Sequence, residues 1–269
     1  MTRVAAIQMA SGPNIDANLI EAARLIQKAV EQGARLVVLP ENFALMGMTE
    51  QDKVAQRERD GDGPIQAFLA DQARRHGIWL VGGTVPLEAD DPQKIRAACL
   101  LYDERGERVA RYDKIHLFDV SLSEHGERYD ESATIEPGDQ VVVADTPFGR
   151  LGLAVCYDLR FPELFRALLD RGAEIFAVPS AFTAITGKAH WEILVRARAI
   201  EDLCYVIAAD QGGYHVNGRE TYGDSMIVDP WGQVLDRLPH GSGIVVAGLD
   251  RERLASIRRN FPSIVHRRL

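Results

Sequence analysis

The chain has 269 residues, 46% of them hydrophobic and 26% charged, a balance typical of a globular protein with a sizeable core. Its formal net charge of −8 repels nucleic acid and anionic membranes, so neither is an expected partner. The three cysteines are widely spaced and include no Cys-x-x-Cys pair, which argues against a disulfide framework and a thiolate zinc site. No signal peptide or membrane-spanning run is recognisable, and a reducing cytoplasm is the expected compartment.

The first half of the chain alternates short apolar runs with amphipathic segments. Apolar side chains recur at near-helical spacing from Asp16 to Glu31, and Gly33 ends this predicted helix. A second helix is predicted from Gly63 to His76 and ends at Gly77. The predicted strands between and after these helices are Arg3 to Met9, Arg35 to Leu39, Ile78 to Thr84, Arg96 to Tyr102 and Arg108 to Tyr112.

A polar segment without clear periodicity, residues 113–140, separates the two halves. Loops of this length in a compact domain are usually functional or mobile. The alternation then resumes, with helices predicted at Pro162 to Arg171, Lys188 to Leu203 and Asp250 to Arg259. The predicted strands of this half are Val141 to Ala144, Leu151 to Val155, Ile175 to Val178, Tyr205 to Ala209, Ser225 to Val228, Val234 to Leu238 and Ile244 to Leu249.

Residues 32–43 and 171–182 are similar to each other. Both contain Gly-Ala, an apolar run, a proline and a phenylalanine three residues later, and both follow a strand and an amphipathic helix. Such a pattern is also a common way to enter and leave a buried strand. Two related units with right-handed crossovers favour an α/β fold in which two sheets pack face to face and helices cover the outer faces. We expect residues 1–269 to form one such domain.

Cys156 lies at a position of the predicted fold where its thiol is accessible for reaction. An apolar run ends at Cys156, and a polar turn leads to Pro162, which suits the first turn of a helix. A thiol at this junction lies at the rim of a sheet, where its reactivity matters more than its packing. Cys99 and Cys204 lie in apolar, strand-like contexts and are expected to be buried. Cys156 is therefore the candidate nucleophile.

A cysteine nucleophile needs a proton acceptor and a group that stabilises an oxyanion. Glu41 follows a buried strand, where burial can raise a carboxyl pKa towards neutrality, although a solvated strand end is the simpler interpretation. Lys114 can stabilise developing negative charge, although composition alone favours an exposed surface lysine. The histidine candidates are His76, His116, His125, His190, His215, His240 and His266. Candidates for a second carboxylate are Glu124, Glu127 and Glu131.

No glycine-rich phosphate loop occurs, and no cluster of His, Asp or Glu has metal-ligand spacing. Three segments, in order, resemble the signature segments of the nitrilase superfamily of carbon–nitrogen hydrolases: Pro40 to Phe43, Lys114 to Asp119 and Cys156 to Leu164. Further segments at 179–182, 185–192, 196–201 and 222–232 are similar to its Nit branch. Within that branch, residues 161–163 and 180–182 resemble deaminated-glutathione amidases more than ω-amidases.

The resemblance implies a four-layer α-β-β-α sandwich with internal pseudo-symmetry and a Glu–Lys–Cys triad. This triad is carried onto Glu41, Lys114 and Cys156. A second glutamate often supports the triad, and Glu131 ahead of Pro137-Gly138 resembles its setting in the Nit branch. The scheme needs no metal or organic cofactor. The family also suggests a homodimer, across which the segment from Phe261 to Leu269 packs.

The implied activity is hydrolysis of a small carboxylate-bearing amide, deaminated glutathione first, through a thioester on the cysteine. The expected substrate-binding residues are Tyr157, Arg160, Phe182 and Lys188. Either Arg160 or Lys188 is expected to hold a substrate carboxylate, and Lys188 stands where relatives are expected to have proline. The alternatives are ω-amidase activity on α-ketoglutaramate or another small amide, a catalytically silent binding protein, and a thiol redox sensor.

Overall fold

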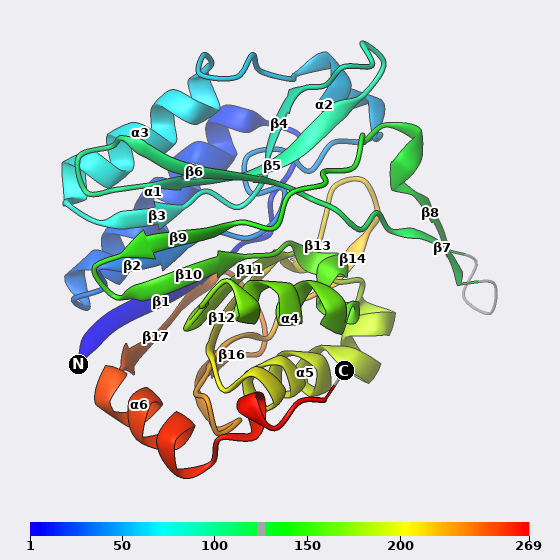
Figure 1. The fold of residues 1–269 in the computed structure, drawn as a ribbon. Coiled ribbons are helices and arrows are strands. Elements are labelled where there is room, and N and C mark those ends of the chain that lie inside the picture. The colour runs from blue at the N-terminus through cyan, green and yellow to red at the C-terminus, as the bar shows by residue number, and fades with distance from the viewer. Residues whose placement is uncertain (123–126, 269) are drawn as a thin grey trace.

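Two β-sheets lie face to face at the centre of the computed structural model, which describes residues 1–122 and 127–268 (Figure 1). The first sheet has the order β17-β1-β2-β3-β5-β4, and β6 also pairs with β5. Strands β1, β2 and β3 run parallel, and β17 and β5 flank them antiparallel. The strands of this sheet are β1 Thr2–Gln8, β2 Leu36–Val38, β3 Trp79–Val81, β4 Val85–Glu88, β5 Ile95–Tyr102, β6 Arg108–Asp113 and β17 Gly243–Leu249.

The second sheet has the order β16-β15-β12-β11-β10-β9. Its strands β10, β11 and β12 are again parallel, and β9 and β15 flank them antiparallel. The path β10–α4–β11–α5–β12 therefore repeats the path β1–α1–β2–α3–β3, as the similarity between residues 32–43 and 171–182 predicts. The strands are β9 Val143–Thr146, β10 Gly149–Leu153, β11 Ile175–Ser180, β12 Tyr205–Asp210, β15 Ser225–Val228 and β16 Val234–Leu238.

Helices cover the outer faces of both sheets and confirm the predicted four-layer arrangement (Figure 1). Helices α1 and α3 pack on the first sheet, and α4 and α5 pack on the second. The bounds are α1 Ile15–Glu31, α2 Gln51–Ala55, α3 Pro64–His76, α4 Pro162–Asp170, α5 Ala184–Asp202 and α6 Arg251–Asn260. Within the described ranges, none of these helices is both long and apolar enough to cross a bilayer.

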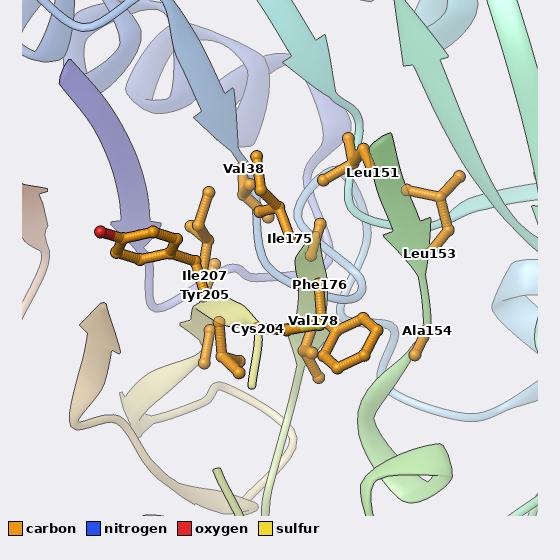
Figure 2. Packing of buried hydrophobic residues seen from close by; sticks show 14 of the residues in the cluster. Val38, Leu151, Leu153, Ala154, Ile175, Phe176, Val178, Cys204, Tyr205 and Ile207 are labelled. Atoms are coloured by element: carbon orange, nitrogen blue, oxygen red, sulfur yellow. The ribbon is translucent and has the colours of Figure 1, made fainter. Parts of the chain in front are cut away.

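Alternation along β2 explains how one strand serves two layers. Leu36 and Val38 belong to the cluster between the sheets, whereas Val37 and Leu39 pack with the helices outside. Successive side chains of a strand point to opposite faces, so an uninterrupted apolar run suits a sheet covered on both sides. Figure 2 shows Val38 among Leu151, Ile175 and other side chains of the second sheet.

Two sequence-based boundaries differ most from the structure. The strand predicted from Ile78 to Thr84 stops at Val81, because Gly82 and a left-handed Gly83 (φ +57°) follow, and β4 begins after this turn. The helix predicted from Lys188 begins a turn earlier at Ala184, where the Thr183 hydroxyl accepts from the Thr186 N–H. Gly187 lies inside this helix, against Tyr222.

The segment 113–140 is not a plain loop. It contains the antiparallel pair β7 (Asp119–Leu122) and β8 (Glu127–Asp130), followed by a 3₁₀ turn at Glu131–Ala133. A second hairpin that the sequence did not reveal comprises β13 (Gly212–Tyr214) and β14 (Glu220–Tyr222). These strands have only three or four residues each, too few for an alternating pattern to mark them as strands in the sequence. Further 3₁₀ turns span Cys156–Arg160 and Ser263–Val265.

Candidate active site

Three buried polar side chains meet beyond the carboxyl ends of strands from both sheets. Glu41 follows β2, Lys114 follows β6 and Cys156 follows β10, and their exposed fractions are 4%, 1% and 8%. The edge beyond the strand ends is where ligands bind in α/β sheets, because the loops there are free to carry functional groups. The shared location agrees with the residues that the family resemblance selects.

The ammonium group of Lys114 lies between two carboxylates. Its Nζ atom is 2.8 Å from Glu41 Oε1 and 3.0 and 2.8 Å from the two carboxylate oxygens of Glu131. The Phe118 backbone N–H also donates to Glu131 Oε2 at 2.8 Å, which fixes this carboxylate in place. Of the second-carboxylate candidates, Glu127 instead accepts from the Tyr129 hydroxyl, and Glu124 lies outside the described residues.

The electrostatics give each member of this group a defined protonation state. Burial disfavours the charged form of Lys114, but the adjacent carboxylates of Glu131 and Glu41 outweigh it and raise the pKa of the lysine well above its ordinary value. Burial, with a further contribution from the Glu41 charge, raises the pKa of Cys156 well above that of a free thiol, and Lys114 only partly opposes this. The resting site therefore holds an ammonium and a neutral thiol at neutral pH, and the thiol needs a base.

The backbone at Cys156 is held in the left-handed region, with φ +49°. A non-glycine residue there carries a cost of about 1–3 kcal/mol and persists only where surrounding contacts impose it. The contacts come from Asp158, whose side chain is fully buried. Its Oδ2 accepts from the Val155 N–H at 2.8 Å, directly before the nucleophile.

Asp158 also ties this turn to the segment that carries Lys114. Its carboxylate accepts from the Tyr112 hydroxyl at 2.6 Å and from the His116 N–H at 3.1 Å. His116 Nδ1 lies 2.7 Å from the same carboxylate, and the imidazole stacks on Phe161 with ring centroids 3.7 Å apart. His116 is thus engaged in this link rather than placed as the proton acceptor for the thiol. Sequence reasoning did not identify Asp158, although it stands only two residues after the nucleophile.

A cavity enclosing about 340 Å³ opens beside the thiol. Of the residues predicted to bind substrate, Tyr157, Arg160 and Phe182 line it. The Arg160 guanidinium lies 5.2 Å from the centre of the Phe182 ring and 5.7 Å from that of Tyr157. No carboxylate among residues 1–122 and 127–268 forms an ion pair with this guanidinium, and His190 Nδ1 is its polar contact at 3.1 Å.

Lys188 does not belong with these residues, and the expectation that it holds substrate is wrong. Its side chain is exposed on α5 and is absent from the described lining of the cavity. Because the helix begins at Ala184, Thr186 points inward and the residue two positions later points to solvent. The lining residues that the sequence did not reveal are Asn42, Phe118, Ala181, Thr183, Thr186 and Arg219. Asn42 and Phe118 lie in signature segments, and Ala181 and Thr186 lie in the segments similar to the Nit branch, so these positions carried a signal that could have indicated them.

Comparison with known proteins supports the same assignment. The family model for carbon–nitrogen hydrolases matches residues 3–259. Proteins named deaminated glutathione amidase are 45% identical in Yersinia enterocolitica and 41% identical in Homo sapiens, each over 98% of this chain and over 92% and 82% of their own lengths.

Solved structures with the same fold are also similar in sequence. The Caenorhabditis elegans NitFhit protein superposes with a TM-score of 0.91 at 37% identity over 99% of this chain, which spans 65% of that longer chain. Saccharomyces cerevisiae Nit3, a member of branch 10 of the nitrilase superfamily, gives 0.87 at 32% identity over 97% of this chain and 94% of its own. An amidase from Nesterenkonia sp. AN1, with acrylamide added at its active-site cysteine, gives 0.81 at 31% identity over 97% of this chain and all of its own. The chain therefore belongs to the carbon–nitrogen hydrolase family of the nitrilase superfamily.

Proposed function

We propose that the protein is an amidase whose substrate is deaminated glutathione, the γ-linked tripeptide in which a keto group replaces the glutamyl amine. The observation that carries this proposal is the neutral, buried thiol of Cys156 beside a Glu41–Lys114–Glu131 ion cluster, in a cavity that the guanidinium of Arg160 also lines. Relatives at 41–45% identity bear the name of this activity. The bond cleaved is the γ-amide between the keto-acid half and cysteinylglycine.

In the first half of the reaction, Glu41 accepts the thiol proton as the sulfur of Cys156 attacks the amide carbonyl carbon. The oxyanion that forms lies between the Lys114 ammonium and the backbone N–H of Tyr157. A donor placed to bind such a charge lowers the activation free energy by about 3–4 kcal/mol. Glu41 then gives its proton to the leaving nitrogen, the C–N bond breaks, and a thioester remains on the cysteine.

In the second half, Glu41 takes a proton from water as the water oxygen attacks the thioester carbonyl. The C–S bond then breaks and Glu41 returns this proton to the departing sulfur, so the acid leaves and both the thiol and the Glu41 carboxylate are restored. Lys114 keeps its proton throughout, because its pKa is raised by the two carboxylates that hold it. Glu131 positions the lysine and takes no part in proton transfer. The scheme uses only side chains, backbone N–H groups and water.

Substrate selection follows from the other groups in the cavity. Among the described residues no carboxylate forms an ion pair with Arg160, which is flanked by the rings of Tyr157 and Phe182, so a keto-acid carboxylate compensates its partial burial. The same acyl group occurs in α-ketoglutaramate, whose leaving group is ammonia. That substrate defines the alternative ω-amidase function.

Two measurements test the proposal. The kcat/KM for deaminated glutathione is expected to exceed that for α-ketoglutaramate, and the reverse order would assign ω-amidase activity instead. Mass spectrometry of wild type quenched during turnover is expected to show the acyl mass on Cys156. Cys156→Ala is expected to form no adduct and to lose turnover by at least about 10³-fold, and substantial turnover by it would refute the scheme. No turnover of any small amide by wild type would favour a silent binding protein.

We also propose that two copies of the chain pair through the exposed face of α5. Ile193 and Ile200 stand seven residues apart on this face and are 69% and 46% exposed, and Trp231 and Val265 lie exposed on neighbouring segments. Contiguous exposed apolar groups of this kind mark association surfaces. Light scattering is expected to give the mass of two chains for wild type and of one for Ile193→Glu/Ile200→Glu. A monomeric wild type would contradict the pairing.

Residues 1–269 are proposed to act as one hydrolase domain, since β17 from the C-terminal part completes the sheet that starts with β1. A reducing compartment such as the cytoplasm suits a catalytic thiol, and all three cysteines are free. Cell fractionation tests this location, and recovery of the enzyme from an oxidising compartment would contradict it.

A further inference from the structure

We propose that Arg219 forms a second carboxylate subsite, which binds the terminal carboxylate of the leaving group. This inference rests on the proposed function, because only a substrate with a charged leaving peptide has a group for this subsite. Deaminated glutathione carries one carboxylate on the keto-acid half and another on the glycine. The cavity correspondingly contains two guanidinium groups, Arg160 and Arg219.

The two guanidinium groups belong to different parts of the site. Arg160 contacts Tyr157, Phe182 and His190, all of which lie on or beside the second sheet and its helices. Arg219 extends from the β13–β14 turn towards the N-terminus of α2 and the strand β8. There it lies 4.9 Å from the centre of the Tyr129 ring and 3.3 Å from Glu50. A substrate with a carboxylate at each end can therefore contact both groups while its amide lies near the thiol.

Arg219 stands where the inner cavity meets a larger outer groove. The groove is the larger of the two spaces and shares Arg219 and Glu131 with the inner cavity. We assign the keto-acid half to the inner cavity and the leaving peptide to the groove.

The charges around Arg219 leave it able to bind an anion. Glu50 is its carboxylate contact, but Lys53 Nζ lies closer to the same carboxylate, at 2.8 Å. The charge of Lys53, against the cost of burial, lowers the pKa of Glu50 to about 2, so one anion is shared by two cations and the group of three carries a net charge of +1.

Other charged residues also line the groove. Asp130 lies 3.8 Å from Arg128 and Glu131 pairs with Lys114, whereas Glu127 contacts the neutral Tyr129 hydroxyl. Among the described residues that line the groove, Arg219 is a cation that shares its carboxylate contact with a second cation, so it is the group assigned to the substrate carboxylate.

The turn that carries Arg219 is anchored rather than free. Asn217 Oδ1 accepts from the Arg219 backbone N–H at 3.0 Å, and Asn217 Nδ2 donates to the Gly47 carbonyl at 2.7 Å. His215, at the other side of the turn, is buried and contacts the Ser11 carbonyl through Nδ1 at 2.8 Å. Because these contacts fix the backbone, the turn itself does not have to be ordered when the guanidinium binds a ligand.

Three substrates with the same acyl group separate this role from a general one. They are deaminated glutathione, its C-terminal amide, which lacks the glycine carboxylate, and α-ketoglutaramate. For Arg219→Gln, kcat/KM on deaminated glutathione is expected to fall about 10- to 100-fold, the range of a charge-assisted hydrogen bond, mainly through KM. The other two substrates are expected to change less than threefold. Arg24→Gln, which removes an exposed arginine on α1, is the control for the loss of one positive charge.

The outcomes are distinct. An equal loss on all three substrates would mean that Arg219 only supports the fold of the site, and an unchanged kcat/KM would mean that no such subsite exists; either result overturns the inference. If wild type cleaves α-ketoglutaramate but not deaminated glutathione, the proposed function fails and the subsite fails with it. If wild type cleaves deaminated glutathione and the losses are equal, the subsite alone fails.

Discussion

The link formed by Asp158 gives the sharpest prediction about how the nucleophile is held. Asp158→Asn keeps the size of the side chain but replaces one acceptor oxygen by an NH₂ group. In the wild type, one oxygen faces the Tyr112 hydroxyl and the Val155 N–H, and the other faces the backbone N–H and Nδ1 of His116. Whichever way the amide is turned, its NH₂ group faces at least one obligate donor, the backbone N–H of Val155 or that of His116.

The loss can be worked out from these contacts. A buried donor left without an acceptor costs about 1–3 kcal/mol, and two such donors that share one site add incompletely. We therefore expect the free energy of unfolding to fall by about 3 kcal/mol. The backbone at Cys156 also loses the contact that keeps it at φ +49°, and a displacement of about 1 Å at a nucleophile costs on the order of 100-fold in rate.

Urea unfolding and steady-state kinetics on the same preparation check both numbers. Asp145→Asn is the matched control, because this carboxylate is 87% exposed and pairs with Arg150 on the surface. It is expected to change stability by less than about 0.5 kcal/mol. If Asp158→Asn unfolds within about 1 kcal/mol of wild type and keeps its kcat within twofold, the turn does not depend on this carboxylate and the reasoning is refuted.

Three further predictions concern other buried groups. Since burial raises the pKa of Cys156, the 240 nm absorbance difference between wild type and Cys156→Ser should show no thiolate up to pH 8, and a step below pH 7 would contradict the neutral resting thiol. Burial raises the pKa of Asp202 to about 7, so the folded state retains a proton that the unfolded state releases, and the free energy of unfolding falls between about pH 4 and pH 7. Asp202→Asn should remove this fall and raise the free energy of unfolding by about 1–2 kcal/mol at pH 8, as measured by urea unfolding. A flat pH profile of wild-type stability would contradict this prediction. A Cβ at Gly187 would lie 2.2 Å from Tyr222 Cβ, so Gly187→Ala should lower the free energy of unfolding by about 1–3 kcal/mol. The control is Gly12→Ala, where the added carbon makes only an ordinary van der Waals contact. An equal loss in the two variants would show that α5 and β14 can move apart at little cost in free energy.

Much of the fold can be predicted from local patterns in this sequence. The similarity between residues 32–43 and 171–182 is enough to predict two parallel units, because a buried strand that follows a covering helix has few alternatives to a right-handed crossover. The hairpins β7–β8 and β13–β14 escape prediction because each of their strands has only three or four residues. Their positions are set by contacts with residues far away in the chain, which no local window contains.

The site is less predictable than the fold for the same reason. Glu41 and Lys114 are 73 residues apart, and their 2.8 Å contact depends on how two strand ends meet. Composition alone favours solvated positions for both residues. Only the resemblance of three segments, in the same order as in the family, grouped them with Cys156. The error at Lys188 arose from the phase of a helix whose first turn was missed. Arg219 stands in a polar turn, which gives no pattern to distinguish a binding group from a solvated one.

The charge balance of the cluster explains why the thiol can stay neutral until substrate arrives. Glu41 and Glu131 carry two negative charges against one on Lys114, so the buried group has a net charge of −1 before reaction. Proton transfer from Cys156 to Glu41 moves this charge from oxygen to sulfur and leaves the total unchanged. No new charge has to be created in a buried site, which would cost several kcal/mol. As the sulfur attacks, the negative charge passes to the carbonyl oxygen, while Lys114, released from one of its two carboxylates by the protonation of Glu41, gains the capacity to stabilise it. In the proposed mechanism Glu131 keeps the ammonium in place at that moment, which gives a role to a second glutamate that never transfers a proton.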